Sequence, residues 1–169
     1  MDVRDQFPLT CRHLGTAAPE AKTATEFVEA VCAANAKGDI PARAARDLVR
    51  YEAALQELRR APSGAPGPVP SDHERVVLSP RVRVLVFGGG LPGMLDALRA
   101  GRSASPRPAR GWIVAWLSPD GKLQEMTLPR EEGWVLERFR EPTTSDDALE
   151  DDEREEFARL WERGVLTRA

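Results

Sequence analysis

The sequence predicts an α+β protein, with a helical N-terminal segment and a C-terminal domain of three strands and three helices. Three observations lead to this prediction. Apolar residues recur at helical spacing in the first part of the chain, a Pro/Gly-rich stretch follows, and a hairpin pattern stands at 111–128. We therefore expect a helical segment over 1–61, a linker over 62–71 and a second domain over 72–169.

The composition is that of a globular chain, because 41% of its 169 residues are hydrophobic and 30% are charged. No run approaches the ~20 apolar residues that a membrane-spanning helix needs. Residues 1–7 show no apolar secretion signal, so we expect a cytoplasmic protein without membrane contact. Cys11 and Cys32 are too few for a disulfide framework, and Cys11 with His13 lacks the further ligands that a metal site requires.

The helical segment is predicted to contain two helices. Residues 1–22 show no period and are expected to form an irregular arm. A first helix is expected over 25–37 and ends at Gly38. Asp39 is expected to cap a second helix, whose apolar face carries residues at spacings of three and four, namely Ala44, Leu48, Tyr51, Leu55 and Leu58.

Two extended segments are predicted after the linker. The first is short, at 76–80, and the second, at 81–87, alternates valines with other residues. The glycine run 88–90 lacks the spacing of nucleotide phosphate loops, so we expect a turn into a helix at 91–100. The basic, Pro-containing stretch 102–110 is expected to be a solvated loop.

The hairpin pattern has two unequal arms. Residues 112–117 are β-branched, aromatic or otherwise apolar, and the turn 118–121 reads Ser-Pro-Asp-Gly. The return arm 122–128 alternates polar and apolar residues, which fits an edge strand beside an interior strand. An edge strand presents N–H and C=O groups with which another chain can pair.

Three helices are predicted after the hairpin, at 129–140, briefly at 146–149, and at 152–163. The order of strand, helix, hairpin and three helices is typical of a winged-helix arrangement. The last helix is expected to point apolar residues inward, namely Phe157, Leu160 and Trp161.

The net charge of −3 hides a polarised distribution. Residues 75–110 hold seven arginines and one acid, whereas residues 131–169 hold thirteen acids and six arginines. The last helix, where a winged-helix protein would read DNA, carries six acids over 151–164 and would repel phosphates. Its acidic run is expected to suit a helix N-terminus and not a metal, because the side chains project all round the helix. Nucleic-acid binding is therefore disfavoured, and peptide binding by strand addition is favoured.

Five segments together resemble the partner subunits of multinuclear non-heme iron oxidases, which are companion proteins in the methanobactin and thiaglutamate pathways. The resemblance covers roughly residues 44–169 and does not extend to the first 40 residues. The segments are RDLVRYEAAL at 46–55, LSPRVRVL at 78–85, LPGMLDAL at 91–98, WIVAW at 112–116 with Asp120-Gly121, and LWERGVL at 160–166.

This resemblance implies a non-catalytic partner protein with no cofactor of its own. It would bind the leader of a ribosomally made precursor peptide and dock onto the iron oxidase, which holds the metal. The strand that pairs with the leader would comprise Leu123, Gln124, Glu125, Met126 and Thr127, and the walls of the groove would be Phe157, Leu160 and Trp161.

Three alternatives stay open. Phe157 and Leu160 are more simply explained as ordinary core residues, because apolar positions at helical spacing usually belong to the core. The arginines between 75 and 110 are compatible with a winged-helix DNA-binding regulator. A stand-alone enzyme is the third alternative, but His13 and His73 are the only histidines and both fall in predicted loops, so a nucleophile–base pair lacks parts.

Overall fold

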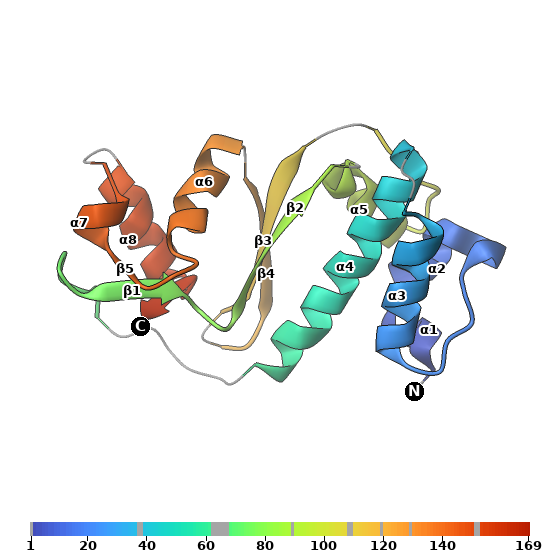
Figure 1. Cartoon of the computed structure of the whole chain (residues 1–169), viewed down its shortest axis with the longest axis horizontal. Helices are drawn as coiled ribbons and strands as arrows, with labels where there is room; N and C mark the ends of the chain where they lie inside the picture. The colour runs from blue at the N-terminus through green and yellow to red at the C-terminus, as the bar shows by residue number, and fades with distance from the viewer. Residues whose placement is uncertain are drawn as a thin grey trace. The chain divides into compact units, whose positions relative to one another are not determined.

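The computed structural model describes residues 2–36, 39–61, 68–88, 90–107, 110–118, 120–128, 130–150 and 153–169 (Figure 1). The fold is α+β, as predicted, with two small antiparallel sheets. Its helices are α1 (Val3–Gln6), α2 (Pro8–Leu14), the 3-10 turn η1 (Gly15–Ala17), α3 (Ala24–Ala34), α4 (Ile40–Arg60), α5 (Leu91–Arg99), α6 (Arg130–Arg138), α7 (Ser145–Ala148) and α8 (Arg154–Glu162). Its strands are β1 (Arg75–Leu78), β2 (Val82–Phe87), β3 (Gly111–Leu117), β4 (Leu123–Leu128), β5 (Thr143–Thr144) and β6 (Leu166–Arg168).

The chain forms two compact units that are not contiguous in sequence. The first unit comprises residues 1–57 and 85–111, and the second comprises residues 58–84 and 112–169. Helix α5 thus belongs with the N-terminal helices, whereas the sequence predicts one division at a linker. Residues 62–67 of that linker lie outside the described residues.

Helices α3 and α4 form where the sequence predicts them. Thr23 caps α3 by accepting a hydrogen bond from the Glu26 N–H, and Asp39 accepts one from the Ala42 N–H ahead of α4. Four of the five residues expected on the apolar face of α4 are buried, and Leu55 is half-buried.

The prediction of an irregular arm over residues 1–22 is wrong, because α1 and α2 form there. Asp2 caps α1, and Phe7 is fully buried with its ring stacked on Phe27 at 4.9 Å between centroids. These short helices are stabilised by packing on distant parts of the first unit, which a local periodicity does not reveal.

A buried carboxylate ties α2 to α4. The two oxygens of Glu52 accept hydrogen bonds from the backbone N–H groups of Leu9 and Thr10, each at 2.8 Å, and from the Thr10 hydroxyl at 2.6 Å. Glu52 thereby satisfies amides at the N-terminus of α2, which have no partner within that helix. Burial raises the pKa of Glu52, while the bonds from Thr10 and Leu9 oppose that rise.

One sheet has the strand order β2-β3-β4 and contains the predicted hairpin. Strands β3 and β4 pair antiparallel with Trp112 opposite Leu128 and Leu117 opposite Leu123. Strand β3 is almost wholly buried, and β4 lies at an edge of the sheet. Both features agree with the unequal arms of the sequence pattern.

The second sheet, with the order β5-β1-β6, contains two strands that the sequence analysis missed. Strand β5 has two residues and β6 has three, and both pair antiparallel with β1. Strands of two or three residues are too short to show an alternation of polar and apolar residues in the sequence. They form by pairing with β1.

The core of the second unit is formed by both sheets together with α6, α7 and α8. Phe139 and Phe157 contact each other with ring centroids 5.6 Å apart. The core residues from β3 are Trp112, Val114 and Trp116, and those from the last helix are Phe157, Leu160 and Trp161. None of the helices described in this structure has the length and apolar character needed to cross a membrane.

The Glu52 contact yields a prediction about stability. We expect Glu52→Gln to lower the free energy of unfolding by about 1–3 kcal/mol, because the amide nitrogen donates where a carboxylate oxygen accepted. The raised pKa means that the folded wild type binds a proton more readily than the unfolded chain, whose ordinary value is 4.5. Wild-type stability from this group therefore falls as pH rises through that window, and the deficit of the variant is larger at about pH 5 than at about pH 8.

Urea unfolding at both pH values measures this deficit. The exposed Glu29→Gln on α3 is the matched control and should change stability by less than about 0.5 kcal/mol. An equal deficit at the two pH values would contradict the assigned direction of the Glu52 pKa.

Candidate peptide-binding edge

The hairpin turn is held by a local set of polar contacts. The Ser118 N–H donates to the Lys122 carbonyl at 2.9 Å, and the Gly121 N–H donates to the Ser118 carbonyl at 2.8 Å. Gly121 has a φ of 80°, a conformation that residues with a side chain rarely adopt. The Lys122 ammonium and then the Ser118 hydroxyl lower the pKa of Asp120 to about 2.

The bonds around the turn determine where each peptide group of β4 points. Hydrogen-bonded and non-hydrogen-bonded pairs alternate along an antiparallel ladder. The Ser118–Lys122 bond makes that pair hydrogen-bonded, so Leu117–Leu123 is the non-bonded pair beside it. In agreement, the Leu117 N–H donates instead to the Arg81 carbonyl, at 3.2 Å, on the side of β2.

Continued along β4, this alternation gives two sets of residues. Gln124, Met126 and Leu128 direct their N–H and C=O groups toward β3. Leu123, Glu125 and Thr127 direct theirs away from β3, to the open edge of the sheet. No described residue accepts a hydrogen bond from the N–H of Leu123 or of Thr127. The edge is therefore a template with a defined register.

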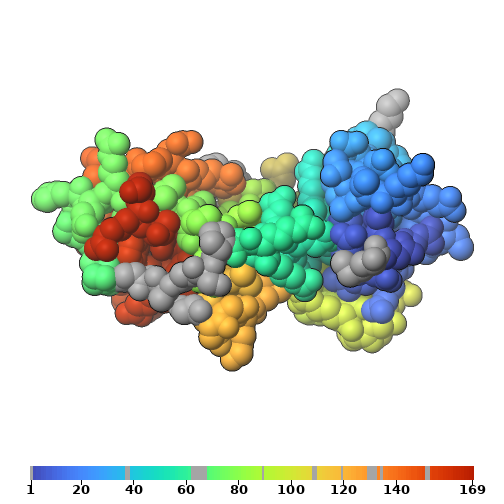
Figure 2. Space-filling view, turned by 90° about the horizontal axis from the view of Figure 1, so that it is seen from below, coloured from blue at the N-terminus to red at the C-terminus, as the bar shows by residue number. Residues whose placement is uncertain are grey.

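The side chains of β4 vary in exposure along this edge. Gln124 and Thr127 are exposed, while Leu123, Glu125 and Met126 are half-buried. Atoms of the hairpin, in gold, lie at the surface in Figure 2. The five residues that the sequence predicts for peptide pairing are therefore all at least partly exposed.

The other three proposed residues lie elsewhere. Phe157, Leu160 and Trp161 are 2–5% exposed and belong to the core of the second unit. Met126 packs against that same core from β4. This placement agrees with the alternative that treats the three residues as core. Their role as walls of a peptide groove stays a prediction.

The first glycine of the run after β2 is hydrogen-bonded to a carboxylate of the same unit. The Gly88 N–H donates to an oxygen of Asp47 on α4 at 2.9 Å. A carboxylate thus occupies one amide that a phosphate would need, which agrees with the absence of a phosphate-loop spacing.

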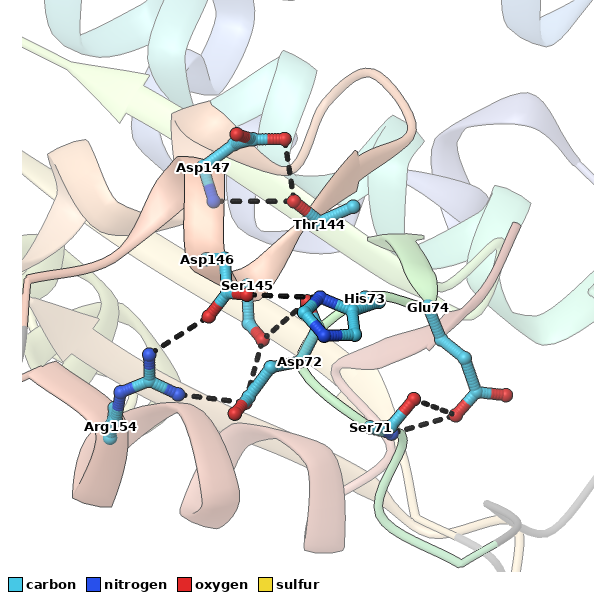
Figure 3. Close-up of polar contacts among 9 residues, drawn as sticks. All are labelled: Ser71, Asp72, His73, Glu74, Thr144, Ser145, Asp146, Asp147 and Arg154. Carbon is cyan, nitrogen blue, oxygen red and sulfur yellow. Dashed lines mark hydrogen bonds and ion pairs between the residues drawn. The ribbon is translucent and has the colours of Figure 1, made fainter.

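A second polar cluster joins the segment 71–74 to α7 and α8 (Figure 3). The Ser145 hydroxyl donates to Asp72, 3.2 Å away, while His73 Nδ1 lies 3.1 Å from an Asp146 oxygen. Arg154 bridges Asp72 and Asp146 at 2.7 and 3.0 Å. The Ser145 hydroxyl bonds to the Asp72 carboxylate and not to the His73 imidazole. These contacts are therefore those of a structural cluster, and they lack the hydroxyl–imidazole bond of a nucleophile–base pair.

Among the residues that the structure describes, no three His, Cys, Asp or Glu side chains converge as metal ligands would. Asp151 and Asp152 of the acidic run lie outside that set. Glu153, from the same run, pairs with Arg138 at 2.7 Å.

Comparison of the chain with family models gives no match, and comparison with curated proteins also gives none.

A pair of proline substitutions tests the assigned direction of the β4 peptide groups. We expect Thr127→Pro to lower the free energy of unfolding by at most about 1 kcal/mol, because its N–H faces the open edge. Gln124→Pro should cost about 3 kcal/mol or more, since it removes a bond to β3.

Chemical denaturation of both variants supplies the comparison, with Thr127→Ala and Gln124→Ala as controls for loss of the side chains. A Thr127→Pro variant as unstable as Gln124→Pro would show that the register assigned to the edge is incorrect.

Proposed function

We propose that this chain is a non-catalytic partner protein that binds the leader of a ribosomal precursor peptide by strand addition to β4. It would present that peptide to a multinuclear non-heme iron oxidase. In this proposal the iron belongs to the oxidase, and the present chain supplies recognition. The peptide-binding part is supported by the edge geometry, and the oxidase part by the resemblance of residues 44–169 to such partner subunits.

One observation carries the proposal: the outward peptide groups of Leu123 and Thr127 on an accessible edge strand. An extended peptide gains affinity from main-chain hydrogen bonds to such an edge, and its alternate side chains give specificity. Strand β3 anchors β4 through a six-residue ladder, so the template exists before the peptide arrives. A preformed template lowers the ordering cost of binding.

We also propose that the second domain has a winged-helix-like arrangement, because β2, β3 and β4 form one sheet and three helices follow it. The other sheet is an addition to that arrangement. The runner-up function, a DNA-binding regulator, has less support on charge. Helix α8 exposes Glu155 and Glu162, which would repel phosphates where a recognition helix lies.

The experiment is co-purification of the full chain from cells that express it with the genes adjacent to its own. We expect an iron-loaded protein at equal stoichiometry, together with a precursor peptide identified by mass spectrometry. Thr127→Pro should lose the peptide, because proline blocks pairing at the edge, whereas Thr127→Ala should retain it.

Recovery of the chain alone, free of iron and bound to DNA fragments in a salt-dependent manner, would contradict this proposal and support the DNA-binding regulator.

A further inference from the structure

The arginines of the acidic C-terminal region are almost all neutralised by carboxylates of the same unit. Residues 131–169 contain six arginines, and five of them have an acidic partner. These five pairs are Arg138–Glu153, Arg140–Glu137, Arg154–Asp72, Arg159–Glu155 and Arg168–Glu74.

Arg163 is the exception, for it contacts none of the carboxylates that the structure describes. It follows α8, its side chain is exposed, and its Nη1 lies 3.4 Å from the Sδ of Met126 on β4. A thioether is a weak acceptor and does not balance a positive charge. A cation from a region that is acidic in sequence thus lies against the edge strand, and none of the described carboxylates pairs with it.

The face of the sheet on which Arg163 lies follows from Met126. The side chain of Met126 packs against the core of the second unit, on the face that also carries Val114 and Leu128. A strand added at the edge would place one residue directly beside Met126, and cross-strand neighbours share a face in either strand direction. The side chain of that residue would therefore emerge next to the Arg163 guanidinium.

We propose that Arg163 is a specificity-determining residue that pairs with an acidic side chain of the bound peptide, at the position beside Met126. This inference rests on the proposed strand addition and deepens it by naming the chemistry of one ligand residue. An Asp or Glu carboxylate is the group that suits this site, because the guanidinium presents its N–H donors in a planar fork and a carboxylate can accept two of them. A lysine at the same position would be repelled.

Selection from a displayed library of random peptides of about ten residues tests this. The peptides are fused at both ends, so no terminal carboxylate is free. The full chain is used as wild type, Arg163→Glu, Arg163→Lys, Arg159→Met and Thr127→Pro. Arg159→Met is the matched control, because it removes a cation one helical turn earlier whose guanidinium already pairs with Glu155 and Glu156.

We expect wild type and Arg159→Met to enrich Asp or Glu about tenfold over Lys at one position of a shared motif. Arg163→Lys should keep that preference at a lower enrichment, because it retains the charge but lacks the planar fork. Arg163→Glu should reverse that preference to Lys or Arg, and Thr127→Pro should enrich no motif.

Two other outcomes separate the claims. A shared motif that Thr127→Pro abolishes but that shows no acidic preference, or one that Arg163→Glu leaves unchanged, overturns the role of Arg163 and leaves strand addition standing. Equal enrichment by wild type and Thr127→Pro, or no motif for either, overturns strand addition itself. A selected peptide made with an amidated and with a free C-terminus should bind equally, whereas a gain with the free terminus would assign the carboxylate to the chain end.

Discussion

The N–H and C=O groups of one strand residue in an antiparallel sheet can form hydrogen bonds to only one of the two neighbouring strands. In β3 this constraint determines which peptide groups of the candidate site face the open edge. The Leu117 N–H bonds toward β2 and the Ser118 N–H bonds toward β4, at the turn. Every other residue along β3 is thereby assigned to one neighbour, and the ladder transmits that assignment to β4. The accessible amides of Leu123 and Thr127 are consequences of it, and so is the placement of Met126 beside Arg163.

The buried side of the sheet makes this edge a fixed template. Strand β3 is buried over most of its length, and its tryptophans pack in the core of the second unit with residues of α6 and α8. Helix α8 is held at its start by Arg154, which bridges Asp72 and Asp146 (Figure 3). Its other end bears Arg163, so the guanidinium is presented from a helix anchored at its opposite end. Specificity can therefore come from one side chain while affinity comes from the backbone.

The sequence predicted what local chemistry determines and missed what distant contacts determine. The hairpin was predictable because the turn before Gly121 and the unequal arms are local signals. Helices α1 and α2 were not, because Glu52 and Phe27, far along the chain, stabilise them. The outward direction of the edge amides depends on the pairing between β2 and β3, which alternation alone does not reveal. Valine alternation in β2 was an imperfect guide to burial, since Val86 is 58% exposed although it follows the period of buried Val82. The role proposed for Arg163 rests on which arginines pair with carboxylates, and those pairs join residues that the sequence alone does not bring together.

The most direct test is amide hydrogen exchange of the full chain by NMR, residue by residue, with and without a saturating peptide that it binds. The free protein should protect the amides of Gln124 and Met126, which bond to β3, and leave those of Leu123 and Thr127 in fast exchange. The peptide should then slow exchange at Leu123 and Thr127. If a bound peptide leaves these two amides in fast exchange, it binds elsewhere on the molecule, and strand addition at β4 is contradicted.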